Sequence, residues 1–408
     1  MARPGERGVL IVGGGAAGTA CAEELRGRGY DGPIVLAARD PDPPYERPPV
    51  SKEYLRGEAP AAPLHVPADV DLRTRTSVLK LDVEARSARL SAGEPVRYDS
   101  ALLAPGANVR RLRFEGAQLG GIHYLRALGN ADALRADAAD AERVVLVGGS
   151  YIACEVAASL TALGHACTLV MLEEAPLTAH FSPAVGAFFA ALLRERGIEL
   201  VTADGVERFE GDDRVRRVTT ASGRALAADL VVMGTGAVPD VLLARASGLA
   251  LGETGGIACS AALATSADGV WAAGDACEYD SLLHRRRARV EHWEVARAQG
   301  RHAAAAMLGE AAPYEEVPYF WSDMADWCTL EALGPVGDWD GEAVRGAYAD
   351  GRFCTFFLAG GRIVGALSVG RPEDLEHARA LMRAGADLGP RAGALLADEA
   401  TDLSSLWT

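Results

Sequence analysis

Apolar and polar residues follow one another in an order that occurs twice along the chain. Residues 8–12 form a short apolar run, residues 13–18 a glycine-rich turn, and the stretch after them is rich in Ala, Glu and Leu at helical spacing. Residues 144–147, residues 148–153 and the Ala-rich stretch that follows repeat this order. A short strand, a tight turn and a helix are typical of a βαβ unit. The sequence therefore predicts two Rossmann-like nucleotide-binding modules in one chain.

Other stretches indicate how the rest of the chain is organised. Residues 41–49 contain five prolines, which predicts an extended loop. Residues 269–273 form another apolar strand that runs into a Gly-Asp pair. Beyond about residue 317 aromatic residues cluster, and residues 353–358 and 363–369 alternate as antiparallel strands do. We therefore expect a separate C-terminal α+β domain.

Length and composition are those of an ordinary globular protein. The 408 residues are too many for one core and suit two or three domains. Hydrophobic residues make up 49% and charged residues 24%, and no apolar stretch approaches the roughly 20 residues of a membrane helix. The first residues lead into a strand rather than a signal-peptide core, so we expect a cytoplasmic protein that does not enter a membrane.

Charge and cysteine content exclude further classes. The formal net charge of −15 disfavours nonspecific binding to nucleic acid or to an anionic membrane. The seven cysteines are scattered without a C-x-x-C pair, so we expect no metal site and no redox dithiol. Reduced thiols in a cytosol fit this pattern. The sequence leaves a monomer and a homodimer open.

The first glycine turn has the features of a dinucleotide site. Gly13 allows the tight turn out of the strand, Gly15 lets the backbone approach a pyrophosphate, and Gly18 lets the helix pack against the sheet. The free N–H groups of the helix N-terminus favour the phosphates, and we expect Ala17 at the cofactor as well. Asp40 lies 22 positions after Gly18, where its carboxylate can accept from an adenosine ribose hydroxyl.

Residues 44–52, which read PYERPPVSK, indicate a family. They resemble the PY(D/E)RPPLSK segment of the ferredoxin reductases that serve bacterial oxygenases, whose fold rubredoxin reductases and apoptosis-inducing-factor-like proteins share. Further similar segments follow in the same order over nearly the whole chain, at residues 228–236, 273–275, 289–293, 299–300 and 320–323.

This resemblance implies a fold and its domains. We expect an α/β protein with two Rossmann-like domains in the glutathione-reductase arrangement and a C-terminal α+β interface domain. Residues 1–108 and 239–316 would form the FAD-binding domain, residues 109–238 an NAD-binding-like domain, and residues 317–408 the C-terminal domain. The C-x-x-x-x-C pair of the disulfide reductases does not occur after Pro48, so we expect no dithiol chemistry.

The resemblance also implies residues around FAD. Lys52 would lie near the flavin N5 and pair with Glu155, because a buried ammonium offsets the charge that builds up on the reduced ring. These two are the expected catalytic residues. Gly274 and Asp275 match the second FAD motif, with Asp275 on the ribityl chain. Further positions that match FAD contacts are Arg47, Val78, Ala104, Arg126, Glu291, Trp293 and Trp321.

The second glycine turn departs from the family. The family reads G-G-G-Y-I-G, whereas Ser150 and Ala153 replace the third and last glycine here. Ser150 places a side chain where the backbone should approach the pyrophosphate, and Ala153 adds a methyl group at the contact between helix and strand. The positions that still match NADH contacts are Gly148, Gly149, Tyr151 and Ile152.

The ribose-binding acid of this module has moved as well. The family's Glu falls at Met171, which cannot accept a hydrogen bond from a ribose hydroxyl, and Glu173 and Glu174 substitute for it only if the turn is rearranged. No arginine lies at this turn to bind a 2′-phosphate, which favours NADH over NADPH. The changes together predict that NADH binds roughly one to three orders of magnitude more weakly. Relaxed drift in a working reductase is the alternative.

The sequence leaves more than one function open. The first is a ferredoxin or rubredoxin reductase, in which hydride passes from NADH to FAD and electrons leave singly for an iron–sulfur protein. The basic run at residues 285–287 with Arg289 either attracts an acidic partner or forms a solvated loop.

The second function is that of an FAD-dependent oxidase or dehydrogenase that acts on a small molecule in a repurposed nicotinamide cleft. Ser150 and Met171 favour it, as do Pro105, where the family usually has Thr, and the residues Met324 and Ala325, where it has Gln-Tyr. A third function, binding or assembly with little turnover, is disfavoured because a purely structural FAD needs no Lys–Glu pair.

Overall fold

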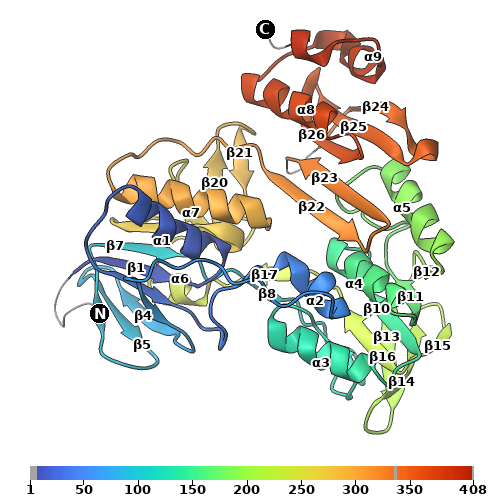
Figure 1. The fold of residues 1–408 in the computed structure, drawn as a ribbon, viewed down its shortest axis with the longest axis horizontal. Helices are drawn as coiled ribbons and strands as arrows, with labels where there is room; N and C mark the ends of the chain where they lie inside the picture. Colours follow the sequence, from blue (N-terminus) through green and yellow to red (C-terminus); the bar gives the residue numbers. More distant parts are fainter. Residues whose placement is uncertain (1–6, 335–337, 407–408) are drawn as a thin grey trace.

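The computed structural model describes residues 7–334 and 338–406, and three five-stranded sheets form its framework (Figure 1). The first sheet is parallel, in the order β19-β7-β1-β2-β3, and its apolar strands β1 and β2 are fully buried, whereas the edge strand β3 is half-buried. Its strands are β1 (Val9–Val12), β2 (Ile34–Ala37), β3 (Asp71–Arg73), β7 (Ser100–Leu103) and β19 (Val270–Ala272).

Two helices of this first region, α1 (Ala16–Gly27) and α7 (Trp293–Met307), lie side by side (Figure 1). A β-carbon on Gly300 would lie 2.1 Å from the carbonyl oxygen of Ala17, so the glycine allows this close approach. The smaller elements here are β4 (Val78–Asp82), β5 (Ser87–Leu90), β6 (Val96–Arg97), α6 (Leu242–Ala246), β18 (Ile257–Cys259), β20 (Cys277–Ser281) and β21 (Arg286–Ala288).

The second sheet repeats the first, in the parallel order β12-β11-β10-β16-β9. Its strands are β9 (Ile122–His123), β10 (Arg143–Val147), β11 (Ala166–Val170), β12 (Glu199–Val201) and β16 (Leu230–Met233). Around it lie α3 (Leu128–Ala138), α4 (Tyr151–Ala162), α5 (Pro183–Glu195) and the small antiparallel sheet of β13 (Val206–Gly211), β14 (Val215–Thr220) and β15 (Ala225–Ala227).

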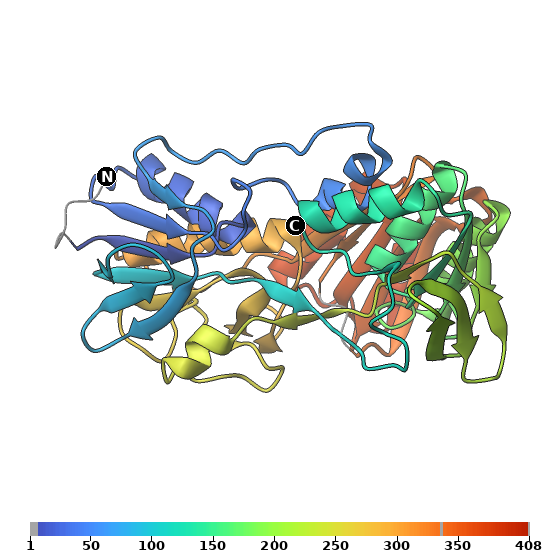
Figure 2. The ribbon, with the colours of Figure 1, turned by 90° about the horizontal axis from the view of Figure 1, so that it is seen from below.

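Two antiparallel strands, β8 (Ala107–Val109) and β17 (Ala237–Pro239), carry the chain from the first region to the second and back (Figure 2). Pro105 stands just before β8. The short helix α2 (Glu53–Arg56) contacts α3 and α4, and the 3-10 turn η1 (Pro48–Ser51) before it contacts them too. These contacts bring the residues at the junction of η1 and α2 next to α4.

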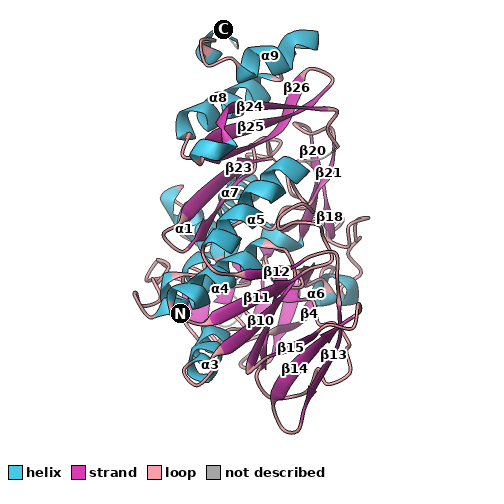
Figure 3. Ribbon diagram, turned by 90° about the vertical axis from the view of Figure 1, so that its right-hand side faces the viewer, coloured by secondary structure: helices cyan, strands magenta, loops and turns pink. Residues whose placement is uncertain are grey.

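The third sheet is antiparallel, in the order β22-β23-β26-β25-β24 (Figure 3). Its strand β22 packs against α4 and α7 and so joins both other regions. The elements are β22 (Tyr319–Met324), β23 (Cys328–Leu333), β24 (Gly341–Ala347), β25 (Arg352–Ala359), β26 (Arg362–Val369), α8 (Pro372–Ala384) and α9 (Ala392–Ala397).

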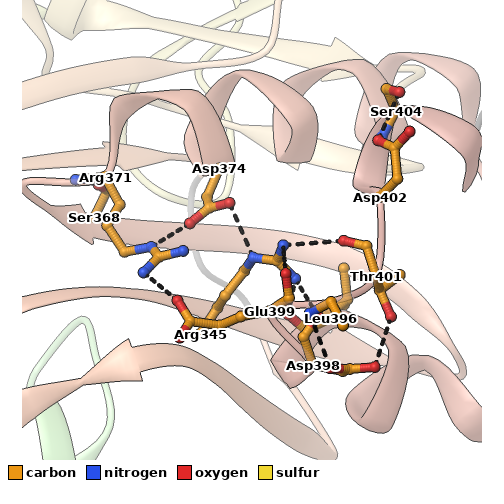
Figure 4. A network of polar contacts seen from close by, with 11 residues as sticks. Arg345, Ser368, Arg371, Asp374, Leu396, Asp398, Glu399, Thr401, Asp402 and Ser404 are labelled. Atoms are coloured by element: carbon orange, nitrogen blue, oxygen red, sulfur yellow. Dashed lines mark hydrogen bonds and ion pairs between the residues drawn. The ribbon is translucent and has the colours of Figure 1, made fainter.

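A buried arginine ties the last residues of the described chain to this sheet (Figure 4). Arg345 Nε lies 3.1 Å from Asp374, and its other nitrogens donate to the carbonyl groups of Asp398, Glu399 and Thr401. Asp374 also accepts from Arg371. A buried guanidinium requires such partners, so this network fixes the segment after α9.

The observed architecture confirms the predicted fold class, with both βαβ units and the C-terminal α+β region. The expectation for residues 41–49 needs one correction, because Pro48 begins a 3-10 turn instead of continuing an extended loop. Proline suits the first turn of a helix, where its missing N–H is not needed. The domain boundaries expected from the sequence stay a prediction.

Two further observations concern residues 7–334 and 338–406. No helix among them combines the length and the apolarity that crossing a bilayer requires. All seven cysteines lie within these residues as free thiols.

Candidate functional site

A cleft with a volume of about 950 Å³ runs between the three sheets and gathers most of the expected site residues. From the first region it is lined by Gly13, Gly15, Ala17, Asp40, Arg47, Lys52, Val78, Ala104, Gly274, Asp275, Glu291 and Trp293. Arg126, Tyr151, Ile152, Glu155 and Trp321 line it from the other two regions. Gly18, Gly148 and Gly149 are not among the lining residues.

The glycine turn after β1 has the close backbone approaches that are typical of a dinucleotide-binding turn. A β-carbon on Gly13 would lie 2.0 Å from the carbonyl oxygen of Ala104, and one on Gly18 would lie 1.9 Å from the carbonyl oxygen of Gly13. A β-carbon on Gly15, at the start of α1, would meet nothing within 4 Å. Gly13 and Gly18 therefore serve the packing, while Gly15 faces open space at a helix N-terminus, where phosphate groups bind.

Two arginine–carboxylate pairs line the part of the cleft that extends from this turn. Arg47 donates to Asp40, and Arg126 donates to Asp275 at 2.9 Å. Arg47 also donates to the carbonyl oxygen of Arg126 at 3.0 Å, which links the two pairs. The backbone N–H of Gly274 donates to Gln299 at 2.8 Å and holds the second motif in place. Both carboxylates thus sit on the cleft wall, each beside a guanidinium.

Lys52 is buried at the point where the three regions meet. Its Nζ lies 3.5 Å from Glu155 Oε1 on α4 and 2.8 Å from Asp323 Oδ2 on β22. The ammonium also stands 5.6 Å from the centre of the Trp321 ring. The expected Lys52–Glu155 pair is therefore present, but the nearer anion is Asp323.

Glu155 is a buried carboxyl with a complete set of partners. Ser51 donates to its Oε2, and Ser322 donates to its Oε1 at 2.6 Å. Burial raises the pKa of Glu155 above its ordinary value, and the charge of Lys52 and the two hydroxyl donors oppose this rise. The pair thus places a carboxyl group with a raised pKa and a positive charge side by side in the cleft wall.

Aromatic rings form the wall next to this pair. Tyr151 lies edge-on to Phe320 with ring centres 4.9 Å apart, and Phe320 stacks on His292 at 4.1 Å. His180 stacks on the other side of Tyr151 at 5.4 Å. Burial lowers the pKa of His292 to about 4, so this imidazole is neutral at neutral pH. The layer is aromatic, and its His292 ring carries no charge at neutral pH.

The second glycine turn adapts to both of its substitutions. Ser150 Oγ donates to the carbonyl oxygen of Gly234 at 3.0 Å, so its hydroxyl points across the turn to the end of β16. A β-carbon on Gly234 would lie 2.7 Å from that of Ala153. The methyl group of Ala153 therefore occupies space that Gly234 leaves free. In the first module the two residue types are exchanged. The glycine, Gly18, lies on the helix, and the alanine, Ala104, follows the strand.

The remaining positions singled out from the sequence differ in whether they face the cleft. Gly148 has a φ of +114° and a β-carbon there would meet the carbonyl oxygen of Gly234 at 2.4 Å, so it serves the turn. Pro105 lines the cleft at the crossover into β8. Met324 is fully buried in the core of the C-terminal sheet.

A second cavity of about 530 Å³ adjoins the cleft. It shares Pro48, Lys52, Trp293 and Trp321 with the cleft, and its other lining residues are Glu46, Pro49, Glu53, Glu294, Arg297, Arg301 and Asp323. The shared residues form one wall between the two cavities. A group bound in the cleft and a group bound in the second cavity would therefore be separated by a single layer of side chains.

The basic run lies mostly outside both cavities. Arg287 pairs with Asp280 at 2.8 Å and donates to two backbone carbonyl groups of its own sheet, and Arg289 pairs with Glu291 at the edge of the cleft. These arginines hold the local structure together. The arginines that line the second cavity are instead Arg297 and Arg301 on α7.

The sequence reasoning missed Asp323, Ser51 and Ser322 as partners of the Lys52–Glu155 pair. Ser51 precedes Lys52 directly, and residues 322 and 323 stand in a segment with a recognised match, so their positions were visible. Their roles depend on the docking of β22 against α4, which no local pattern reveals.

Comparison with known proteins agrees with this architecture. Residues 7–300 match the family model of pyridine nucleotide-disulphide oxidoreductases, and residues 319–407 match the reductase C-terminal domain. The chain is 33% identical to rhodocoxin reductase of Rhodococcus erythropolis, covering 95% of this chain and 92% of that protein. It is 34% identical to the ferredoxin reductase component of chlorobenzene dioxygenase from Cupriavidus sp. (strain PS12), covering 98% and 97%. The crystal structure of the covalent putidaredoxin reductase–putidaredoxin complex contains a similar chain, with a TM-score of 0.92, 32% identity and coverage of 99% and 98%.

Proposed function

Because the chain belongs to the pyridine nucleotide-disulphide oxidoreductases, among their ferredoxin reductase members, we propose that it passes electrons from NADH through FAD to a ferredoxin- or rubredoxin-type iron–sulfur protein. The observation that carries this proposal is the wall between two cavities that Pro48, Lys52, Trp293 and Trp321 form. The cleft has room for dinucleotides, and the second cavity opens a short path to a protein partner.

The residues of the cleft fit FAD. When bound, FAD accepts a hydride from the nicotinamide and hands its two electrons on one at a time. The turn at Gly13 and Gly15 would hold its pyrophosphate. Asp40 and Asp275 would accept hydrogen bonds from its hydroxyl groups while each also accepts from its arginine. These assignments of single residues to FAD are our proposal.

Lys52 and Glu155 would set the charge beside the reactive ring. The ammonium of Lys52 offsets negative charge that arises on reduction, and it is held in place by Glu155 and Asp323 from different regions. The hydroxyl donors Ser51 and Ser322 keep the Glu155 carboxyl oriented towards Lys52. The neutral rings of Phe320 and His292 keep water away from this side of the cleft.

The nicotinamide module supports NADH as the electron donor. Ser150 turns its hydroxyl towards Gly234, and the methyl group of Ala153 is accommodated, so neither substitution blocks the turn. The buried Met324 lies outside both cavities. The features that favoured a repurposed cleft therefore leave the nucleotide path open, and we place the reductase first. The seven free thiols suit the cytoplasm, which is the compartment we propose.

Anaerobic stopped-flow mixing of the yellow holoprotein with NADH or NADPH tests the proposal. We expect NADH to bleach the flavin absorbance within seconds and NADPH to do so more slowly. Subsequent mixing with an oxidised ferredoxin should restore the yellow colour in one-electron steps. A protein that NADH leaves yellow, while light and a sacrificial donor still bleach it, would rule the reductase out and leave the small-molecule oxidase.

A further inference from the structure

The two βαβ modules can be compared residue by residue, because their strands pair in the same way. In the first module Val12 pairs with Ala37 at the end of β2, and in the second Val147 pairs with Val170 at the end of β11. The glycine turns begin at the next residue in both modules. Counting on from the strand ends makes Ala38 equivalent to Met171, and it makes Asp40 equivalent to Glu173.

The residue directly after the strand is a core residue in both modules. Ala38 and Met171 are 3% and 2% exposed. A β-carbon on Gly14 would lie 2.7 Å from that of Ala38, and a β-carbon on the equivalent Gly149 would lie 3.1 Å from the sulfur of Met171. Position 171 therefore packs beneath the glycine turn, and a polar group there would need to leave the core.

The acid two residues further on is directed to the glycine turn. A β-carbon on Gly149 would lie 3.2 Å from Glu173 Oε2, so the carboxylate stands beside the turn. The backbone holds it there, because the N–H of Ala203 donates to the carbonyl oxygen of Glu173 at 2.9 Å and the N–H of Leu177 donates to that of Gly149 at 2.9 Å. Glu174, the next residue, is exposed to solvent.

We propose that Glu173 is the residue that accepts hydrogen bonds from the adenosine ribose of NADH, and that it selects NADH over NADPH. It takes the place of the acid that the module lacks at position 171, as Asp40 does in the first module. A carboxylate at this place accepts from the 2′- and 3′-hydroxyls and repels a 2′-phosphate. The inference rests on the proposed function only in naming NADH as the ligand.

The test compares two neighbouring carboxylates in the FAD-loaded protein. Isothermal titration calorimetry with ADP-ribose and with its 2′-phosphate measures binding at this module without any turnover. Glu173→Gln should weaken ADP-ribose binding about tenfold, which corresponds to about 1.4 kcal/mol. Glu174→Gln removes the same charge one residue away and should change it less than about twofold, since exposed charges are screened. Glu173→Asp should recover part of the loss.

The 2′-phosphate derivative provides the second readout. The wild type should bind it more weakly than ADP-ribose, and Glu173→Gln should narrow that difference at least threefold. Equal effects of the two Gln variants, no effect of Glu173→Gln, or no ADP-ribose binding by the wild type would overturn the inference. If ADP-ribose binding depends on Glu173 but NADH fails to bleach the flavin, the inference about Glu173 stands and the reductase function is rejected.

Discussion

The ammonium of Lys52 lies 2.8 Å from the carboxylate of Asp323, a residue 271 positions further along the chain. The two come from different regions, η1 with α2 on one side and β22 on the other. Asp323 is partly exposed to the second cavity, whereas Lys52 and Glu155 are buried. The charge beside the cleft is therefore set partly by a residue that lines the second cavity.

The first prediction concerns this contact. Asp323→Asn removes an anion next to Lys52, which leaves the surroundings of the ring more positive and stabilises its reduced form. We expect the two-electron midpoint potential of the flavin to rise by on the order of 30 mV, equivalent to about 1.4 kcal/mol. Photoreduction in the presence of a reference dye measures it. Asp326→Asn, on the same hairpin, is the matched control, and an unchanged or lower potential in Asp323→Asn would contradict the assigned role.

A second prediction concerns Ser150. Its hydroxyl donates to the carbonyl oxygen of Gly234, so the side chain stabilises the turn rather than obstructing it. Ser150→Gly should lower the free energy of unfolding by about 1 kcal/mol and change the dissociation constant for NAD⁺ by less than about threefold. Thermal unfolding and calorimetric titration provide the two values. Binding that becomes tenfold tighter would restore the interpretation that Ser150 blocks the pyrophosphate.

A third prediction exchanges the small residues of the second module. Gly234→Ala places two β-carbons 2.7 Å apart, against Ala153, and should destabilise the protein by about 1–3 kcal/mol. Adding Ala153→Gly reproduces the arrangement of Gly18 and Ala104 and should recover at least half of the loss. Chemical denaturation of the single and double variants measures the coupling. Additive losses would mean that the two positions do not share this space.

Acid sensitivity provides a fourth prediction. Burial lowers the pKa of His292 to about 4 from an ordinary value of 6.5. The unfolded chain therefore binds more protons between these values, so the stability due to neutral His292 is complete above about pH 6.5 and is lost as the pH falls towards about 4. Asp275 opposes this lowering and His180 adds to it. We expect about 1–3 kcal/mol to be lost, with release of fluorescent FAD.

The control for this prediction is another half-buried histidine. Burial also lowers the pKa of His284 to about 4, but His284 lies outside both cavities. Either variant, His292→Gln or His284→Gln, should flatten the loss of stability between pH 6.5 and about 4. Acid release of FAD should shift to lower pH in His292→Gln alone. Identical release curves for the two variants would show that His292 has no special place at the cofactor.

The fifth prediction concerns electron exit. Arg301 lines the second cavity and is exposed, so it can steer an acidic partner. Arg301→Glu should lower the second-order rate of electron transfer to an acidic ferredoxin about tenfold at low salt, with less effect at high salt, and leave bleaching by NADH unchanged. Arg285→Glu makes the same change in the basic run outside both cavities. A larger loss with Arg285→Glu would favour docking at that run.

How well the sequence predicts each feature of this molecule depends on how far apart along the chain the interacting residues lie. The glycine turns could be predicted because Gly13 and Gly148 adopt positive φ values, which glycine adopts readily. The residue type at these positions therefore indicates the turn. The side-chain direction of Ser150 could not be predicted, because its acceptor lies 84 residues away. The same holds for Asp323, whose contact with Lys52 exists only once β22 has docked. Local pattern thus predicted the modules, and their mutual packing decided the details of the site.

The placement of Trp321, Ser322 and Asp323 on one strand has a consequence for how such proteins diversify. These three side chains belong to the C-terminal sheet, and Trp321 and Asp323 line the second cavity, yet all three also lie next to the buried Lys52–Glu155 pair. A graft of the C-terminal domain from a relative would therefore transfer recognition and cofactor tuning as a single inherited unit. Chimeras joined near residue 317 would reveal how tightly evolution has coupled the two traits.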